Sequence, residues 1–247
     1  MDLLINRISI LRKIYVLLFC LKHPNYWQDR LITAQRPDSF MSDDKFLKAF
    51  SIGKETGSWP IPQIHWRIHI MIWAAGIALN TKGDFIECGV NLGGFAKAIM
   101  AYHQFNKTGR TYYLCDTFEG GKGENLFLLK EKNNRNFYKH YKNTFDRVKE
   151  IFSKDEVVLV KGLIPKSLEK VKGKKFAYIS MDLNSAKAEY DALKILWPQL
   201  SGGGVIVFDD HSFVGYEESL KLHTQFAKEV GVDILCLPTG QGIIIKN

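Results

Sequence analysis

Cysteine is scarce in this chain, and its spacing excludes two kinds of site. The 247 residues contain four cysteines, at positions 20, 88, 115 and 236. Zinc sites and small disulfide frameworks need cysteines at close, recurring spacings, and none occurs here. Cys88 and Cys115 instead fall in apolar runs, where a free thiol packs as a small hydrophobe. We therefore expect a reducing, cytoplasmic environment.

The chain also lacks a hydrophobic run long enough to cross a bilayer. Its most apolar stretch, residues 8–21, is interrupted by Arg12 and Lys13 and is shorter than the roughly 20 residues of a spanning helix. No small-residue cleavage site accompanies it, so we expect no signal peptide. We expect an amphipathic helix that packs on a second subunit of a homo-oligomer. Peripheral contact with a membrane surface, flanked by Arg7 and Lys22, is the alternative.

No nucleic-acid recognition motif accompanies the basic balance of the chain. The formal net charge is +8, but the Lys and Arg residues are spread out, with short clusters only in 130–135 and 166–175. Charge of this kind is typical of a solvated surface. We therefore expect no nucleic-acid partner.

The length suits one large α/β domain, and the sequence shows no repeats or low-complexity tracts. Residues 1–60 are expected to form a helical N-terminal extension or lid, and residues 61–247 the main domain. From residue 83 onward, apolar strand patterns alternate with helical patterns. The expected strands are 85–88, 111–115, 156–160, 175–181, 204–208, 233–237 and 242–246, and the expected helices are 65–79, 93–105, 145–152, 164–171, 187–197 and 217–230.

This alternation predicts a doubly wound, mostly parallel seven-stranded sheet with helices on both faces. The last connection, residues 238–242, is too short for a crossover helix, so the final strand must form an antiparallel hairpin with its neighbour. A doubly wound sheet that ends in such a hairpin is typical of Rossmann-like class I methyltransferases rather than of nicotinamide dehydrogenases.

A glycine-rich turn follows the first of these strands. The run Glu87-Cys-Gly89-Val-Asn91-Leu-Gly93-Gly leads into a helix, and the next strand ends on Asp116, about twenty residues beyond the turn. Glycines allow the backbone to approach a ligand, and an acid at this place accepts hydrogen bonds from ribose hydroxyls. The turn departs from the dinucleotide pattern G-x-G-x-x-G, which favours an adenosine ligand without a pyrophosphate. S-adenosylmethionine is the best candidate; a tight turn with an unrelated acid downstream is the alternative.

Acidic residues also follow two later strands. Asp182 closes one strand, and Asp209 and Asp210 close the next. The carboxyl ends of neighbouring parallel strands converge, and carboxylates there repel one another unless a cation intervenes. Oxygen ligands suit Mg²⁺ or another hard divalent cation better than zinc. Helix capping by Asp209 or Asp210 is the alternative, and it explains only one of the three acids.

Taken in order, these motifs resemble the macrocin O-methyltransferase (TylF-like) family over roughly residues 60–246. They are the glycine turn, Cys-Asp-Thr-Phe-Glu-Gly at 115–120, Val-Lys-Gly at 160–162, Ile-Ser-Met-Asp at 179–182, and the run from 197 to 210 that ends Val-Phe-Asp-Asp. The resemblance implies S-adenosylmethionine-dependent, Mg²⁺-dependent methylation of a hydroxyl, typically on a sugar.

The resemblance also implies roles for individual residues. It places Glu87, Gly89, Asn91, Gly93 and Asp116 at the cofactor. It makes Asp182, Asp209 and Asp210 the metal ligands. Asn184 departs from the family pattern, which has a second Asp there, and this difference concerns the acceptor more than the cofactor.

Two residues are candidates for the base that takes the hydroxyl proton. Asp182 is preferred because a carboxylate facing the metal can also contact the acceptor, and His211, directly after the acid pair, is the second candidate. Phe118, beside the ribose acid, is the aromatic residue expected to pack on adenine. The acceptor is expected to be a small molecule or a glycan, bound under the 119–143 insertion and the N-terminal extension.

Three other classes of protein stay open at this point. A nicotinamide-dependent sugar oxidoreductase shares the glycine turn and Asp116 but leaves the acid trio and the terminal hairpin unexplained. A non-catalytic interaction protein on a methyltransferase fold is expected to have lost site acids that are present here. An RNA methyltransferase accounts for the basic charge but needs a recognition module that the sequence does not show.

Overall fold

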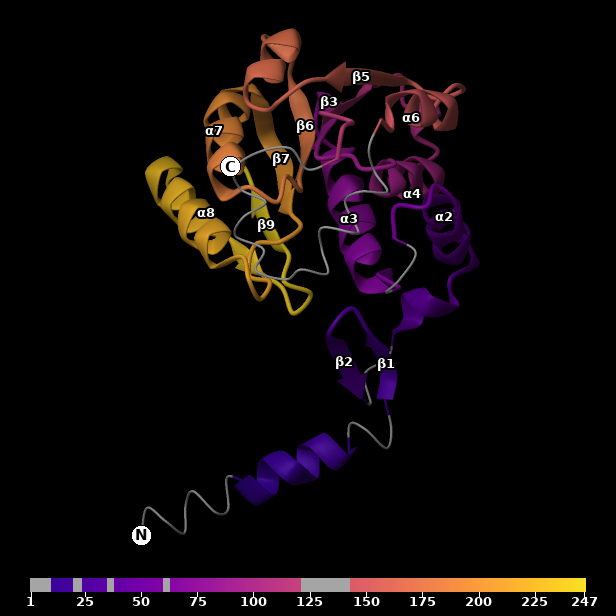
Figure 1. Ribbon diagram of the computed structural model, residues 1–247, viewed down its shortest axis with the longest axis vertical. Helices are drawn as coiled ribbons and strands as arrows, with labels where there is room; N and C mark the ends of the chain where they lie inside the picture. The colour runs from indigo at the N-terminus through magenta and orange to yellow at the C-terminus, as the bar shows by residue number, and fades with distance from the viewer. Residues whose placement is uncertain (1–9, 20–23, 35–37, 60–62, 121–142) are drawn as a thin grey trace.

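The computed structural model describes residues 10–19, 24–34, 38–59, 63–120 and 143–247 (Figure 1). Most of the predicted acceptor-binding insertion, residues 121–142, lies outside this described part. The two ends of the predicted N-terminal apolar stretch lie outside it as well.

The centre of the molecule is a seven-stranded sheet with the strand order β5–β4–β3–β6–β7–β9–β8. The first five strands in this order pair in parallel, whereas β9 is antiparallel to both β7 and β8. The predicted sheet and its terminal hairpin are therefore confirmed. The strands are β3 (Asp84–Cys88), β4 (Tyr112–Asp116), β5 (Val157–Lys161), β6 (Phe176–Met181), β7 (Leu200–Phe208), β8 (Leu235–Cys236) and β9 (Gly242–Ile245).

Helices cover both faces of this sheet, as the alternating pattern predicts (Figure 1). Ser185 caps α7 by accepting a hydrogen bond from the backbone of Ala188, and Asp43 caps α2 in a related way. The α-helices are α2 (Asp44–Glu55), α3 (His65–Ala78), α4 (Gly94–His103), α6 (Phe145–Ile151), α7 (Ala186–Leu196) and α8 (Glu217–Val230). The 3-10 helices are η1 (Ser39–Ser42), η2 (Phe105–Lys107), η4 (Lys166–Val171) and η5 (Trp197–Gln199).

The core consists of two apolar layers, one on each face of the sheet. Successive side chains of a strand point to opposite faces, so Phe85 packs with α2, α3 and α4 whereas Ile86 packs with α7 and α8. Phe46 and Phe50 of α2 are buried in the first layer. Helix α2 therefore belongs to the core of the main domain, although it lies within residues 1–60.

The N-terminal part is not helical throughout. Residues 10–19 form a helix, but β1 (Pro24–Gln28) and β2 (Leu31–Ala34) form an antiparallel hairpin that the sequence analysis did not predict. Its turn, Asp29-Arg30, has positive φ at both residues, as a two-residue type I′ turn requires. Glycine and asparagine are the usual signals for such a turn, and this turn has neither.

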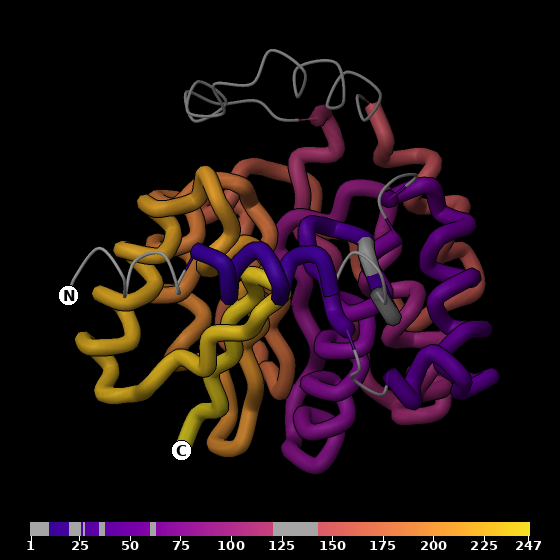
Figure 2. Tube along the Cα trace, turned by 90° about the horizontal axis from the view of Figure 1, so that it is seen from below, coloured from indigo at the N-terminus to yellow at the C-terminus, as the bar shows by residue number. Residues whose placement is uncertain are grey.

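Figure 1 shows the helix of residues 10–19 standing away from the sheet domain, with the β1–β2 hairpin between them. Figure 2 views the molecule from below and shows the same helix in front of that domain. Among the described residues, no helix has both the length and the apolar character needed to span a bilayer.

Candidate active site

The three predicted acids meet at the carboxyl ends of β6 and β7. Asp182 directly follows β6, and Asp209 and Asp210 follow β7, which ends at Phe208. One carboxylate oxygen from each acid lies within 4.8 Å of the others. Because the strand has already ended, Asp209 and Asp210 are free of the alternation that sends neighbouring strand residues to opposite faces. The structure therefore brings the acids together as the sequence predicts.

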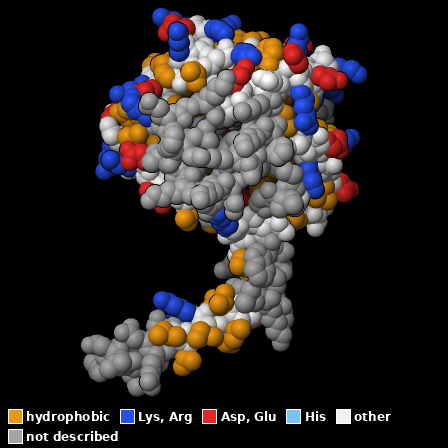
Figure 3. All heavy atoms as spheres, in the orientation of Figure 1, with side chains coloured by type: hydrophobic (Ala, Val, Ile, Leu, Met, Phe, Trp, Pro, Cys, Tyr) orange, Lys and Arg blue, Asp and Glu red, His pale blue; other side chains and the backbone are white. Residues whose placement is uncertain are grey.

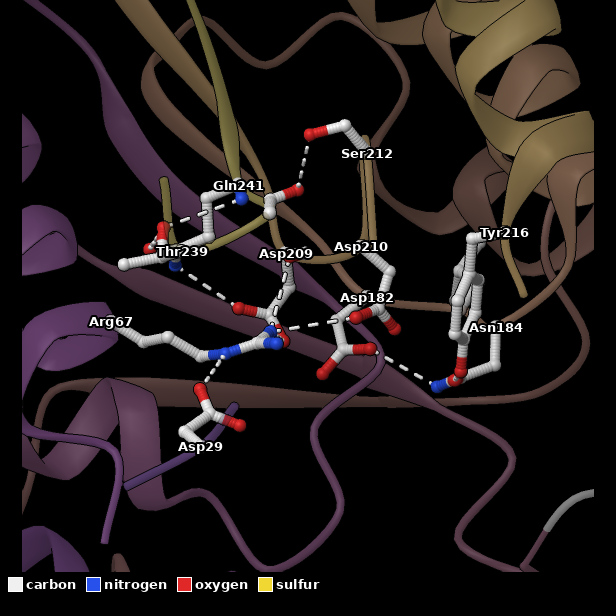
Figure 4. Close-up of polar contacts among 12 residues, drawn as sticks. Asp29, Arg67, Asp182, Asn184, Asp209, Asp210, Ser212, Tyr216, Thr239 and Gln241 are labelled. Atoms are coloured by element: carbon white, nitrogen blue, oxygen red, sulfur yellow. Dashed lines mark hydrogen bonds and ion pairs between the residues drawn. The ribbon is translucent and has the colours of Figure 1, made fainter. Parts of the chain in front are cut away.

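A buried arginine, which the sequence analysis did not select, lies against these acids. Nη1 of Arg67, from α3, lies 2.6 Å from Oδ2 of Asp209 and 3.4 Å from Oδ1 of Asp210. Its Nε lies 2.6 Å from Oδ2 of Asp29, in the turn of the β1–β2 hairpin (Figure 4). The ring of Phe213 packs on the guanidinium, with its centroid 4.7 Å from Cζ. The hairpin is thereby joined to the acid cluster.

Two amide side chains orient the acids. Nε2 of Gln241 donates to Oδ1 of Asp209 at 3.0 Å, and Nδ2 of Asn184 donates to Oδ1 of Asp182 at 3.1 Å (Figure 4). The hydroxyl of Tyr216 donates to the amide oxygen of Asn184. A carboxylate at position 184 could not donate to Asp182, so Asn184 gives this acid a fixed donor.

Burial and crowding change the acidity of the cluster. Burial, followed by repulsion from Asp209 and Asp210, raises the pKa of the Asp182 carboxyl well above its usual range. The same causes, burial and then the charge of Asp209, raise the pKa of Asp210 to about 7. Burial alone would lower the pKa of Arg67, but the negative charges of Asp209, Asp210 and Asp29 outweigh this effect and raise that pKa. The arrangement favours a cation among the acids.

His211, the second candidate for the base, lies elsewhere. Its side chain is 1% exposed, and its Nδ1 lies 3.2 Å from Nδ1 of His223 in α8. Nε2 of His223 lies 2.8 Å from Glu189, whose other oxygen accepts from the backbone N–H of Leu183. Burial, and then His223, lowers the pKa of His211 to about 4. This series of hydrogen bonds links α8 and α7 to the turn after Asp182. The buried position of His211 argues against it as the base.

The glycine turn is tied to Asp116. Oδ2 of Asp116 accepts hydrogen bonds from the backbone N–H of Val90 at 2.7 Å and of Asn91 at 3.1 Å, and Oδ1 accepts from that of Phe118 at 2.9 Å. The carboxylate therefore shapes the turn directly. A role at ribose hydroxyls stays a prediction, and the carboxylate still has acceptor capacity for it.

The N-terminal part lies against this turn. The backbone N–H of Gly94, at the start of α4, donates to Oγ of Ser58 at 2.9 Å, and Nδ2 of Asn91 donates to the Ser58 carbonyl at 3.3 Å. A Cβ on Gly94 would lie 2.1 Å from the indole of Trp59, so glycine is required here for close packing of protein on protein. Residues 58–59 thus cover part of the turn.

Two other predicted cofactor residues are buried. Glu87 is 1% exposed, burial raises the pKa of its carboxyl well above its usual range, and the hydroxyl of Tyr112 donates to it at 3.4 Å. Phe118 is 1% exposed and packs edge-on against Phe145, with ring centroids 5.3 Å apart. This placement favours a core role for Phe118 over contact with adenine, which stays a prediction.

The cofactor turn and the acid cluster are contiguous. Gly89 has φ of +90°, and a Cβ there would lie 1.8 Å from the carbonyl oxygen of Asp182. No side chain fits between these two backbones, so glycine is required at this position. A ligand held at the turn is therefore adjacent to a ligand held by the acids.

Comparison with known families gives one match that covers most of the chain. The model of the family described as Macrocin-O-methyltransferase (TylF) matches residues 72–234. No curated protein matches the chain.

Solved structures share the fold at low sequence identity. The O-methyltransferase NovP is 18% identical with a TM-score of 0.59, covering 73% of this chain and 79% of its own. CalS11, a TDP-rhamnose 3′-O-methyltransferase of calicheamicin biosynthesis, is 17% identical with a TM-score of 0.54, covering 82% and 95%. MycE of the mycinamycin pathway, solved with Mg and SAH, is 12% identical with a TM-score of 0.53, covering 81% of this chain and 54% of its own.

Proposed function

Because this chain belongs to the macrocin O-methyltransferase family and is an S-adenosylmethionine-dependent O-methyltransferase, we propose that it methylates a hydroxyl of a sugar or of a glycosylated small molecule. One observation carries the proposal, namely the contact between the glycine turn at Gly89 and the acid cluster at Asp182. Methyl donor and hydroxyl acceptor must be adjacent for in-line transfer, and these two backbones meet there. CalS11, which shares the fold, is a sugar O-methyltransferase by its own description.

We place S-adenosylmethionine at the turn formed by Glu87, Gly89, Asn91 and Gly93, with Asp116 as the acid that accepts from the ribose. An observation beyond the motif supports this assignment. Oδ1 of Asn91 is buried without a hydrogen-bond partner among the described residues. A buried acceptor of this kind is costly unless a ligand donates to it.

We assign Asp182, Asp209 and Asp210 as ligands of Mg²⁺ or another hard divalent cation. The three carboxylates fit such an ion because they offer only oxygen donors, and because burial and then repulsion from neighbouring acids raise the pKa values of Asp182 and Asp210. MycE, solved with Mg and SAH, shares the fold. When bound, the cation stabilises negative charge that develops on the acceptor oxygen.

The residues of the chain then divide the remaining work. The acceptor oxygen forms a bond to the methyl carbon, the carbon–sulfur bond breaks, and sulfur keeps the electron pair. We assign the departing hydroxyl proton to the carboxylate of Asp182, because a carboxylate that faces the metal site can also contact the acceptor hydroxyl. Asn184 fixes that carboxylate by donating to its Oδ1. Arg67 and Gln241 hold Asp209 in place from the other side.

The proposal is tested by incubating the full chain with labelled S-adenosylmethionine and a panel of sugar nucleotides and glycosides. Transfer of the label to a hydroxyl, with release of S-adenosylhomocysteine, is expected for at least one glycosylated acceptor. Titration calorimetry with S-adenosylmethionine and with NAD separates the alternatives. Binding of NAD alone would favour the oxidoreductase, and binding of neither would favour the non-catalytic interaction protein.

A further inference from the structure

The helix of residues 10–19 presents an apolar surface that no described part of the chain covers. Seven large apolar side chains on it are between 46% exposed (Ile14) and 68% exposed (Tyr15). In Figure 3 they form a continuous hydrophobic band along a helix that stands away from the main domain. Soluble proteins rarely leave such a band in water, so we expect a surface outside the described part of the chain to cover it.

The polar side chains of this helix lie together. Arg12 and Lys13 are adjacent, whereas Leu11, Ile14 and Leu18 follow the i, i+3, i+7 spacing that defines the opposite face. Figure 3 shows Lys and Arg atoms on one side of the helix and apolar atoms along the other. A helix with a broad apolar face and a narrow basic face is typical of proteins that lie in a membrane interface.

The charge around the helix indicates what the covering molecule is. Between Asp2 and Asp29 the sequence has four Lys or Arg residues and no acidic residue, so this short segment carries half of the net charge of +8. Such a segment attracts an anionic surface. A second copy of the chain would bring an equally basic, acid-free segment against it, and like charges oppose that contact.

We propose that the helix of residues 10–19 docks this protein on an anionic lipid bilayer, with its axis in the plane of the headgroups. At about 1.5 Å per residue, the ten helical residues extend roughly 15 Å, about half of the hydrocarbon thickness, so the helix cannot span. Its apolar face enters the acyl boundary, and Arg12 and Lys13 remain at the phosphates. Tyr15, whose ring stacks on that of Phe19 with centroids 6.4 Å apart, suits the headgroup level.

The hairpin connects this docking helix to the proposed active site. The hydroxyl of Tyr26 in β1 donates to the carbonyl of Gln63, just before α3, and Asp29 binds Arg67 beside the acids. Asp29 is the tenth residue after Phe19, which limits the distance between them to about 35 Å. A docked helix therefore keeps the acid cluster close to the lipid surface.

The test is vesicle flotation with the full-length protein. One set of vesicles contains phosphatidylcholine alone, and a second contains phosphatidylcholine mixed with phosphatidylglycerol. We expect the protein to float with the anionic vesicles only and to be released at high salt, because salt screens the attraction between exposed charges. Arg12→Gln with Lys13→Gln is expected to weaken partitioning about 30-fold, since each cation near an anionic surface contributes about 1 kcal/mol.

Apolar contact is tested separately. Leu11→Ser with Leu18→Ser removes two side chains that are 65% and 60% exposed, so the fold of the main domain should not change. We expect this variant to lose vesicle binding while retaining affinity for S-adenosylmethionine. The matched control, Leu163→Ser with Val214→Ser, removes equally exposed side chains elsewhere (61% and 78%) and should float like the wild type.

Three outcomes overturn the docking proposal. Equal flotation with neutral and anionic vesicles would show that charge does not select the surface. Equal loss in the control variant would show that the helix is not the contact. A third result would be a wild-type protein that is dimeric in light scattering and binds neither kind of vesicle, together with a Leu11→Ser, Leu18→Ser variant that is monomeric. That result would show that a second copy covers the helix. None of these outcomes bears on methyl transfer, so the docking proposal and the proposed function fail independently.

Discussion

At the residue scale, Arg67 neutralises part of a cluster in which three carboxylates converge. Its guanidinium is buried and lies within 3.4 Å of two of these acids and of Asp29. Replacing it with Met should leave the carboxylates uncompensated and lower the free energy of unfolding by about 3 kcal/mol in EDTA, the scale for a broken buried ion pair. Urea denaturation measures the loss, and Mg²⁺ should restore part of it. The control is Lys48→Met, at an exposed cation of α2, which should change stability little. Equal stability of Arg67→Met and wild type in EDTA would contradict the prediction.

Asp116 holds the glycine turn and is proposed to bind the ribose, and one substitution removes both interactions. Asp116→Ala should weaken S-adenosylmethionine binding by about 2–3 kcal/mol, the scale of a lost pair of charge-assisted hydrogen bonds. Because the carboxylate also accepts from the turn at Val90 and Asn91, part of this loss should come from a looser turn. Calorimetry measures the affinity, with the exposed Asp146→Ala as the matched control. Unchanged affinity in a folded Asp116→Ala protein would remove Asp116 from the cofactor site.

Metal dependence is also argued from single residues. Excess EDTA should abolish methyl transfer and Mg²⁺ should restore it. Asp182→Asn and Asp209→Asn should each lower Mg²⁺ affinity in calorimetry at least about 100-fold, since even residues that only support a ligand contribute 10- to 100-fold. Asp233→Asn, at an exposed acid, serves as the control. Full activity after chelation would point to a metal-free mechanism that rests on Asp182.

At the scale of elements, the chain His211–His223–Glu189 joins α8, α7 and the turn after β6. The pKa of His211 falls from 6.5 to about 4 on folding, so between these values the unfolded state binds the additional proton. Stability from His211 is therefore complete above about pH 6.5 and is lost as the pH falls toward 4. Urea denaturation of the wild type and of His211→Gln at pH 7.5, 6 and 5 should show their stability difference shrinking with acid. The surrounding acids are the same in the wild type and in His211→Gln. If the free energies of unfolding of the two proteins changed equally with pH, His211 would not be held neutral in the folded state.

The sequence predicts the elements of the main domain because each of its strands and helices carries a local signal. Apolar runs such as 204–208 and the short connection 238–242 determine strand type and direction before any tertiary contact is known. The β1–β2 hairpin was missed because Asp29 and Arg30 adopt positive φ without glycine or asparagine. The sequence does not single out Arg67, because one cation in an apolar helix has no spacing signal. Arg67 and Asp209 are 142 residues apart in the sequence, and only the fold brings them into contact.

At the scale of the whole molecule, the predicted boundary at residue 60 separates elements that pack together. Helix α2 contributes Phe46 and Phe50 to the core, and Ser58 binds the start of α4, so deleting residues 1–50 would damage the fold. The part that stands apart ends before the hairpin (Figure 1). Whether the protein forms the predicted homo-oligomer stays a prediction that light scattering of the full chain decides. A cut after residue 23 is therefore the informative truncation.

Removing residues 1–23 should separate docking from chemistry. The hairpin keeps its contacts through Tyr26 and Asp29, so affinity for S-adenosylmethionine and turnover of a free sugar nucleotide should remain those of the full chain. Turnover of a glycan anchored in anionic vesicles should fall at least tenfold, because the enzyme no longer concentrates at the surface that carries the acceptor. For each protein, full-length and truncated, the measurement is the turnover rate on the vesicle-anchored glycan divided by the rate on the free sugar nucleotide. An equal loss on both acceptors would show that these residues act on the site itself, as a cover over bound substrate. An unchanged ratio would show that the helix brings no acceptor to the site.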